Sequence, residues 1–137
     1  MPSDRDSDTG RPEALHTVSD ADKAAAISAV CKALTGQPVD ARIEMIDYDG
    51  RLGPRGPFRY YSTMRFALFA TDTDAAPEDI VDALQQIDDG TFANAIATAL
   101  GKLANENYLG YIAMKRIGSR GGRGRQIAEI RIQLAMA

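Results

Sequence analysis

Alternating apolar and polar residues predict a β-strand at the end of the chain. Every second residue from 128 to 136 is apolar, while Glu129, Arg131 and Gln133 between them are polar. This period of two is typical of a strand with one buried and one solvated face. Another apolar segment begins at Tyr108, and residues 118–125 between the two contain four glycines and three arginines. We therefore expect a hairpin over residues 108–136 with a basic, glycine-rich tip.

A second hairpin is predicted earlier in the chain. Apolar residues at 39, 41, 43 and 45 alternate with charged ones, and residues 58–68 form a long, strongly β-prone segment. The residues expected to share its apolar face are Phe58, Tyr60, Met64, Phe66 and Leu68. Residues 49–57 are too rich in glycine and proline for regular structure, so they form the predicted tip of this hairpin.

A helix is predicted before the first hairpin. Apolar residues at 27, 30, 31 and 34 predict a helix over residues 20–35. Ser19 and Asp22 form an acceptable N-terminal capping pair, and Gly36 and Pro38 supply the stop.

Two further helices are predicted before the second hairpin. Pro77 suits the first turn of one of them. Thr91 is the expected N-cap of the other. The residues expected to point inward from that helix are Phe92, Ile96, Ala99, Leu100 and Leu103.

The predicted order of helix, two strands, two helices and two strands indicates an α+β fold. Sequential hairpins favour an antiparallel sheet with helices packed on one face. The centre of the core is expected at Phe66, Leu68, Ile130 and Ile132.

The two halves of the chain show a possible internal repeat. Shifting the first half by about 70 residues brings Lys32 onto Lys102 and Val30 onto Leu100. This match indicates either an internal duplication or a chance recurrence of a helix–strand–strand order that is common in α+β chains.

The length of 137 residues fits one domain, expected over residues 19–137. Residues 1–18 are acidic and poor in apolar side chains, which predicts a disordered arm that is either passive or becomes ordered against a neighbouring subunit. No segment resembles a signal peptide or a membrane span. Because Cys31 is the only cysteine, a reducing compartment such as the cytoplasm is expected.

The usual catalytic residue sets cannot be assembled from this sequence. His16 is the only histidine and falls in the predicted arm, and Cys31 lies on an apolar helical stripe, which indicates a buried thiol. Gly101 and Lys102 lack the spacing of a phosphate-binding loop, and the glycines of 118–124 do not open a helix. The Asp47/Asp49 and Asp72/Asp74 pairs lack the spacing of a calcium loop. We expect no catalytic residue, no metal and no cofactor, and hence a non-enzymatic protein.

The arginines of the two tips are the remaining candidate site. They are Arg51, Arg55, Arg120, Arg123 and Arg125. Guanidinium groups beside glycines suit carboxylates of another subunit or phosphates, although hairpin tips are also commonly only solvated. Tyr60 and Tyr61 near the first tip could stack on bases or simply pack. The net charge of −3 argues against a generally basic nucleic-acid coat.

The layout resembles a known family. A proline- and glycine-rich loop leading into a long strand (GPFRYYSTMRFALFAT), a helical middle and a final hairpin (YLGYIAMKRIGSRGGRGRQIAEIRIQLAM) are similar to the tail-terminator and head–tail completion proteins of tailed bacteriophages. That resemblance implies a ring-forming homo-oligomer that contacts other structural proteins of a virion through extended loops. The alternative is a small nucleic-acid or anionic-ligand binding module that uses the same arginines.

Overall fold

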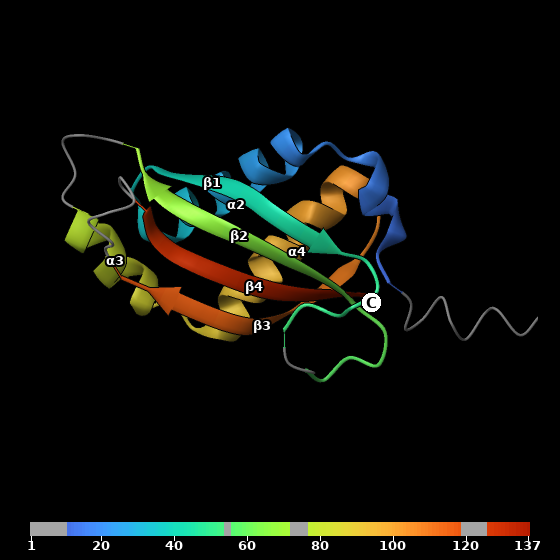
Figure 1. Ribbon diagram of the computed structural model, residues 1–137. Coiled ribbons are helices and arrows are strands. Elements are labelled where there is room, and N and C mark those ends of the chain that lie inside the picture. The colour runs from blue at the N-terminus through green and yellow to red at the C-terminus, as the bar shows by residue number, and fades with distance from the viewer. Residues whose placement is uncertain (1–10, 54–55, 72–76, 119–125) are drawn as a thin grey trace, which may run out of the picture.

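The structure, a computed structural model, describes residues 11–53, 56–71, 77–118 and 126–137. Its elements are η1 (Glu13–Thr17), α2 (Asp20–Thr35), β1 (Val39–Asp47), β2 (Ser62–Ala70), α3 (Pro77–Gln85), α4 (Asp89–Ala104), β3 (Tyr108–Ile117) and β4 (Gln126–Met136). The four strands form one antiparallel sheet in the order β1-β2-β4-β3 (Figure 1). The predicted α+β class and element order are confirmed.

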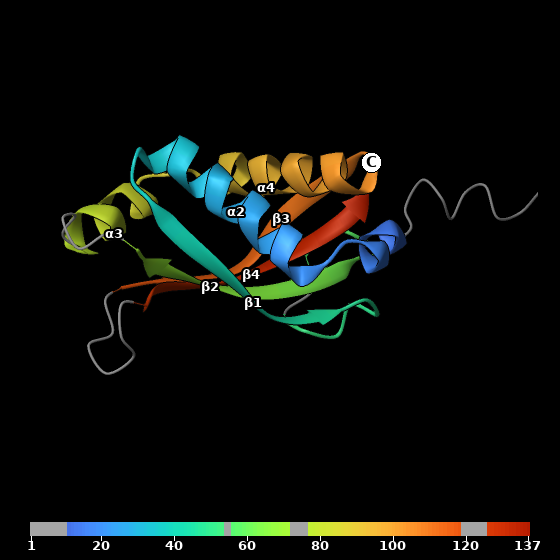
Figure 2. The ribbon, with the colours of Figure 1, turned by 90° about the horizontal axis from the view of Figure 1, so that it is seen from above.

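The helices lie on one face of this sheet. Figure 2 shows α2 and α4 side by side above the strands, and no described helix covers the opposite face. We call that second surface the helix-free face. None of the helices in the described part of the chain is long and apolar enough to cross a membrane.

The core lies between the sheet and the helix layer. Phe66, Leu68, Ile130 and Ile132 are all fully buried, as predicted. They belong to the same cluster of buried side chains as Ile27 of α2 and Ile96 of α4. Truncating a core side chain of this size to alanine typically costs about 2–5 kcal/mol.

Capping residues set the helix ends. Ser19 Oγ accepts a hydrogen bond from the backbone N–H of Asp22 at 3.1 Å, so α2 has the bounds and the cap that the sequence predicted. The prediction for α4 was wrong, because its N-cap is Asp88, whose carboxylate accepts from the N–H of Thr91. Leu103 does not point inward: it is 42% exposed.

The loop between β1 and β2 is longer than predicted and lies against the helix-free face. β2 begins at Ser62, so residues 58–61 belong to the loop. A side chain at Gly56 would collide with Gln133 of β4 and the ring of Tyr111 of β3. Gln133 is consequently 0% exposed, although the alternating pattern predicted a solvated position.

Part of the predicted N-terminal arm is ordered. Residues 13–17 form η1, and Leu15 is fully buried among core side chains. The prediction of disorder is therefore wrong for this segment, because one leucine anchors it. Residues 1–10 lie outside the described residues.

Two αββ units of the fold match closely. The first comprises α2, β1 and β2, and the second comprises α4, β3 and β4. A shift of 69 residues places Asp20–Thr35 on Asp89–Ala104, both 16 residues long. The same shift places the left-handed C-cap Gly36 on the left-handed C-cap Asn105.

The strands of the two units follow the same shift. β1 and β3 start at equivalent positions, and each carries one bulged residue, Glu44 in β1 and Ala113 in β3. A shift of 69 puts Lys32 on Gly101, so the residue matches predicted with a shift of 70 were one position out. Because equivalent strands β2 and β4 pair in the centre, the two units are related by an approximate two-fold axis through the sheet.

Candidate binding face

Of the five predicted arginines, only Arg51 lies in the described part of the chain. Its side chain is 80% exposed and its guanidinium lies 3.7 Å from the carboxylate of Asp49. The backbone N–H of Arg51 donates to the carboxylate of Asp47 at 2.8 Å. The predicted site residues Arg55, Arg120, Arg123 and Arg125 lie outside the described residues.

The first strands of the two hairpins end at opposite ends of the sheet. β1 ends at Asp47, which pairs with Thr63, whereas β3 ends at Ile117, which pairs with Ala128. In the antiparallel order β1-β2-β4-β3, those strand ends point in opposite directions (Figure 1). The described ends of the two connections therefore lie at opposite ends of the sheet.

The two candidate stacking residues differ in exposure. Tyr61 is only 8% exposed, and its backbone and ring lie against Gly50. Tyr60 is half-buried, and the guanidinium groups of Arg11 and Arg59 lie 5.6 and 5.5 Å from its ring centroid. Stacking on a base would therefore compete with cation–π contacts that Tyr60 already makes.

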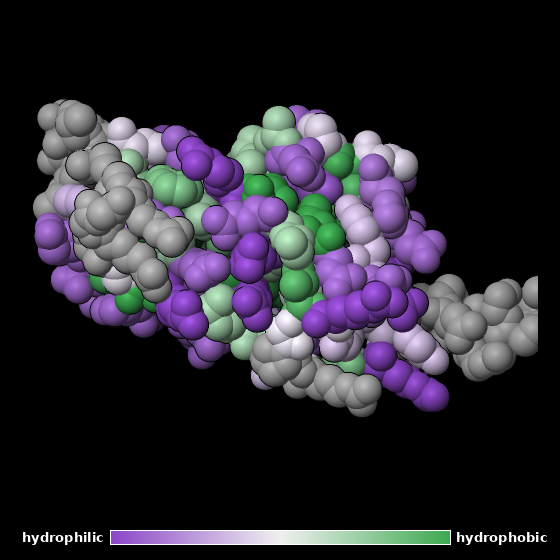
Figure 3. Space-filling view, in the orientation of Figure 1, coloured by the Kyte–Doolittle hydropathy of each residue, from purple (hydrophilic) through white to green (hydrophobic). Residues whose placement is uncertain are grey.

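Instead, charged and apolar side chains gather on the helix-free face. Strand alternation puts four arginines and four acidic residues on it: Arg42, Arg65, Arg116, Arg131, Asp40, Glu44, Asp47 and Glu129. Met45, Leu109 and Tyr111 of the edge strands lie on the same face and are 45%, 45% and 38% exposed. Figure 3 looks onto this face and shows apolar side chains among hydrophilic ones.

A row of four residues crosses the centre of this face. Met45 pairs with Arg65, Arg65 with Arg131, and Arg131 with Met114. The approximate two-fold axis relates Met45 to Met114 and Arg65 to Arg131. Two arginines are thus direct cross-strand neighbours, an arrangement that normally disfavours pairing unless other groups balance the charge.

Two glutamates balance the charge of Arg65. Its Nε lies 3.5 Å from Glu44 and 3.8 Å from Glu129. Glu129 also pairs with Arg116 at 3.7 Å. Arg131 makes no ion pair with any described residue, and this distinguishes it from Arg65, since the buried Nε atoms of both arginines have no hydrogen-bond partner. The alternating pattern placed Arg131 on the polar face, but only the β2–β4 register reveals Arg65 beside it.

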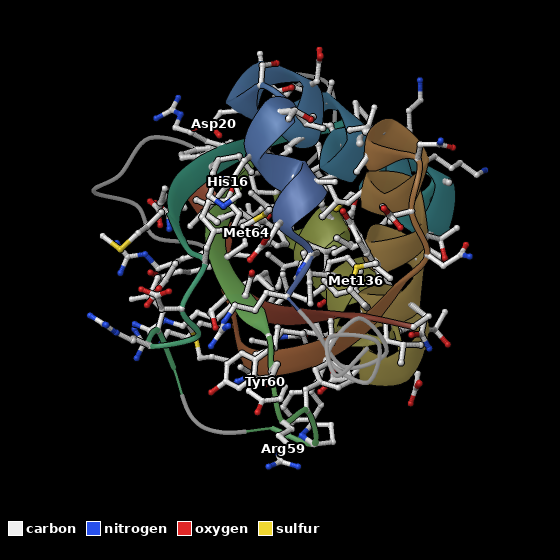
Figure 4. All side chains as sticks on the ribbon, turned by 90° about the vertical axis from the view of Figure 1, so that its right-hand side faces the viewer. His16, Asp20, Arg59, Tyr60, Met64 and Met136 are labelled. Atoms are coloured by element: carbon white, nitrogen blue, oxygen red, sulfur yellow. The ribbon has the colours of Figure 1, made fainter. Side chains whose placement is uncertain are left out.

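A cluster that sequence reasoning missed surrounds the start of α2. Lys23 is 2% exposed, and its Nζ lies 3.2 Å from Asp20 and 3.4 Å from the hydroxyl of Tyr48. The ring of His16 stacks on Tyr48 with the centroids 3.6 Å apart. Figure 4 shows His16 and Asp20 on one side of this end of the molecule and Tyr60 and Arg59 on the other. These contacts tie η1 and the β1–β2 loop to α2.

An open groove lies between α2 and α4 on the outside of the helix layer. Alanines make up half of its lining, and the rest includes Val30, Thr98 and the exposed Leu103. Its polar lining residues are few, so it offers little for binding a polar ligand.

Two buried groups have raised pKa values. Burial raises the pKa of the Cys31 thiol to about 12, which keeps it protonated and a poor nucleophile, as expected for a buried structural cysteine. Burial, with smaller contributions from Glu106 and Tyr48, raises the pKa of Tyr108 to about 12. Among the residues that the structure describes, no group of three or more His, Cys, Asp or Glu side chains could hold a metal ion.

Comparison of the chain with protein-family models, curated proteins and solved structures found no match. The helix-free face is therefore the basis of the function proposed below.

Proposed function

We propose that this chain is a non-enzymatic assembly protein that forms a homo-oligomer through the helix-free face of its sheet. The observation that carries the proposal is the position of Met45, Leu109 and Tyr111. Leu109 and Tyr111 are neighbours on one face of the edge strand β3, and Met45 lies on the opposite edge strand. Exposed apolar side chains that gather within a polar rim mark protein–protein contact surfaces.

The composition of the face supports a protein partner. Tyrosine, methionine and arginine are enriched in protein interfaces, whereas lysine is depleted. The helix-free face has Tyr111, two methionines and four arginines, and none of its described strand residues is a lysine. Its equal numbers of acidic and basic side chains also suit contact with a second copy of the same face, since each sign can meet its opposite.

Nucleic acid is a less suitable partner for this face. Binding to the phosphate backbone depends on arginine and lysine side chains that are free to neutralise phosphates. Arg65 and Arg116 already face glutamates, and Arg42 lies over the ring of Phe69, 4.6 Å from its centroid. The four carboxylates spread over the face would repel the closely spaced phosphates of a nucleic-acid backbone.

The resemblance to phage tail-terminator and head–tail completion proteins gives this proposal its setting. In such a particle, the oligomer would contact other structural proteins, and the tip arginines Arg55, Arg120, Arg123 and Arg125 would be further contact residues.

The experiment is light scattering over a concentration series with two matched variants. Leu109 lies on the helix-free face and Leu103 on the helix layer, with exposures of 45% and 42%. Leu109→Asp is expected to weaken self-association at least tenfold, because it buries an unpaired charge in the interface, whereas Leu103→Asp is expected to leave it unchanged. A monomeric wild type at every concentration, or equal effects of the two variants, would refute the proposal.

A further inference from the structure

The approximate two-fold axis makes Arg65 and Arg131 a matched pair on the helix-free face. The shift that relates β1 to β3 places the bulged residue Glu44 on the bulged residue Ala113. The same axis relates β2 to β4. Thr63 corresponds to Glu129, because Glu129 lies diagonally across the β2–β4 pair from Arg65 and Thr63 lies diagonally across it from Arg131. The two residues that supply carboxylates to Arg65 are therefore replaced by alanine and threonine around Arg131.

The replacement leaves Arg131 without a carboxylate partner among the described residues. The Nε of Arg131 and the Oγ1 of Thr63 are both buried, and neither has a hydrogen-bond partner among the described residues. The Nε of Arg65 also lacks a hydrogen bond, but it has carboxylates at 3.5 and 3.8 Å, whereas Arg131 makes no ion pair with a described residue. Thr63 is 0% exposed. A buried donor without an acceptor is costly, so unsatisfied groups of this kind usually indicate a bound water, ion or ligand.

The β1–β2 loop encloses the position from one side. A side chain at Gly53 would meet the Cδ of Arg131 at 3.5 Å and the Cβ of Ala113 at 3.8 Å, so this loop backbone lies directly over both residues. The loop keeps the arginine stem dry, while Arg131 as a whole remains only half-buried. Part of its surface thus remains accessible from solvent.

We infer that Arg131 and Thr63 form a carboxylate-binding site on the helix-free face. The guanidinium of Arg131 would donate to the carboxylate oxygens as Arg65 faces Glu44 and Glu129, and the hydroxyl of Thr63 would donate a further hydrogen bond. The assignment favours a carboxylate over a phosphate because carboxylates fill the equivalent position around Arg65. The inference concerns the chemistry of the ligand and does not depend on self-association.

The test follows the side-chain Nε–H signals of Arg131 and Arg65 in ¹H–¹⁵N correlation spectra at constant ionic strength. The probes are acetate, a short glutamate-rich peptide and inorganic phosphate, with chloride as the reference. We expect the Arg131 signal to shift and saturate with acetate and with the peptide. The Arg65 signal should not respond, because Arg65 already has its carboxylates. Arg131→Lys assigns the signal by removing it.

A second variant supplies the carboxylate within the chain. Ala113→Glu places a glutamate where β1 has Glu44, and it is expected to shift the Arg131 signal without added ligand and to weaken acetate binding at least tenfold. Arg116→Gln is the control on the same face and should leave binding unchanged. A Kd at least tenfold lower for the peptide than for acetate would identify a protein side chain as the source of the carboxylate, and equal values a small carboxylate.

Two results would overturn the inference. One is an Arg131 signal that moves no more in acetate than in chloride, which would indicate that only water occupies the position. The other is tighter binding of phosphate than of either carboxylate probe. Because the spectra report on the monomer as well as on any oligomer, either result is separate from a failure of the proposed self-association.

Discussion

The first and second αββ units have the same helix length, the same kind of N-cap and C-cap, and bulges at equivalent positions of their edge strands. Their side chains agree in the core, where Ile27 and Ile96 are both fully buried. They differ where helix meets strand and on the helix-free face. Caps and apolar spacing are therefore sufficient for this backbone plan, whereas the differing positions are free to specify contacts.

At one buried helix position the two units differ in chemistry: Phe92 of α4 occupies the position of Lys23 of α2. Phe92 is 1% exposed, so Phe92→Ala is expected to lower the free energy of unfolding by about 3–5 kcal/mol. Lys23→Met keeps most of the buried stem and is expected to change it by less than about 1.5 kcal/mol. Urea denaturation measures both. Equal losses would show that the two positions carry similar packing energy despite their different chemistry.

The distance between helix and edge strand also differs between the units. Gly110 of β3 occupies the position of Ala41 of β1, and a side chain at Gly110 would collide with the backbone carbonyl of Ala93. Gly110→Ala should therefore destabilise the protein by about 1–3 kcal/mol. The reverse change in the first unit, Ala41→Gly, is expected to cost only about 0.5–1 kcal/mol. Thermal unfolding of the two variants would contradict this asymmetry if Gly110→Ala melted like the wild type.

Cys31 and Leu100 occupy equivalent positions, but only Cys31 can ionise. Its pKa is about 12 in the folded protein and lower when unfolded, so folding favours the protonated thiol. The corresponding stability is present below the unfolded pKa and is lost as the pH rises above about 9, by at most about 1.4 kcal/mol per pH unit.

Cys31→Ala should reduce this loss between about pH 9 and 10. A further decline should persist above about pH 10, where the raised pKa of Tyr108 acts with the same sign. Denaturation midpoints measured across this range would refute the assignment if wild type and variant declined in parallel.

Local signals in the sequence were sufficient for most of the fold. The Ser19 cap and the apolar spacing gave α2 its bounds, and strand alternation identified the core residues Phe66 and Ile130. The start of α4 was misplaced because Asp88 and Thr91 are both good capping residues. The start of β2 was misplaced because residues 58–61 are β-prone but belong to a loop held by contacts with distant strands.

The candidate binding face could not be predicted to the same extent. Arg65 and Arg131 are far apart in sequence and become neighbours only through the β2–β4 pairing, which no local pattern specifies. The burial of Gln133 likewise results from a loop that begins some 80 residues earlier. The arginines of the glycine-rich tips stand out in the sequence, whereas Arg131 has the alternating pattern of any solvated strand residue.

The smallest expected effect comes from the carboxylates that face Arg65 and are missing around Arg131. Glu44→Ala removes one carboxylate from Arg65 and should lower the free energy of unfolding by about 0.2–1 kcal/mol, since the pair is partly exposed. Ala113→Glu, the same exchange in reverse, should raise it by a similar amount by giving Arg131 its first carboxylate. In an Arg131→Met background, Ala113→Glu should bring no gain, because the glutamate then has no cation to face. A double-mutant cycle with a coupling energy near zero would mean that Glu at position 113 does not reach the guanidinium, and that the two units are not electrostatically equivalent at this row.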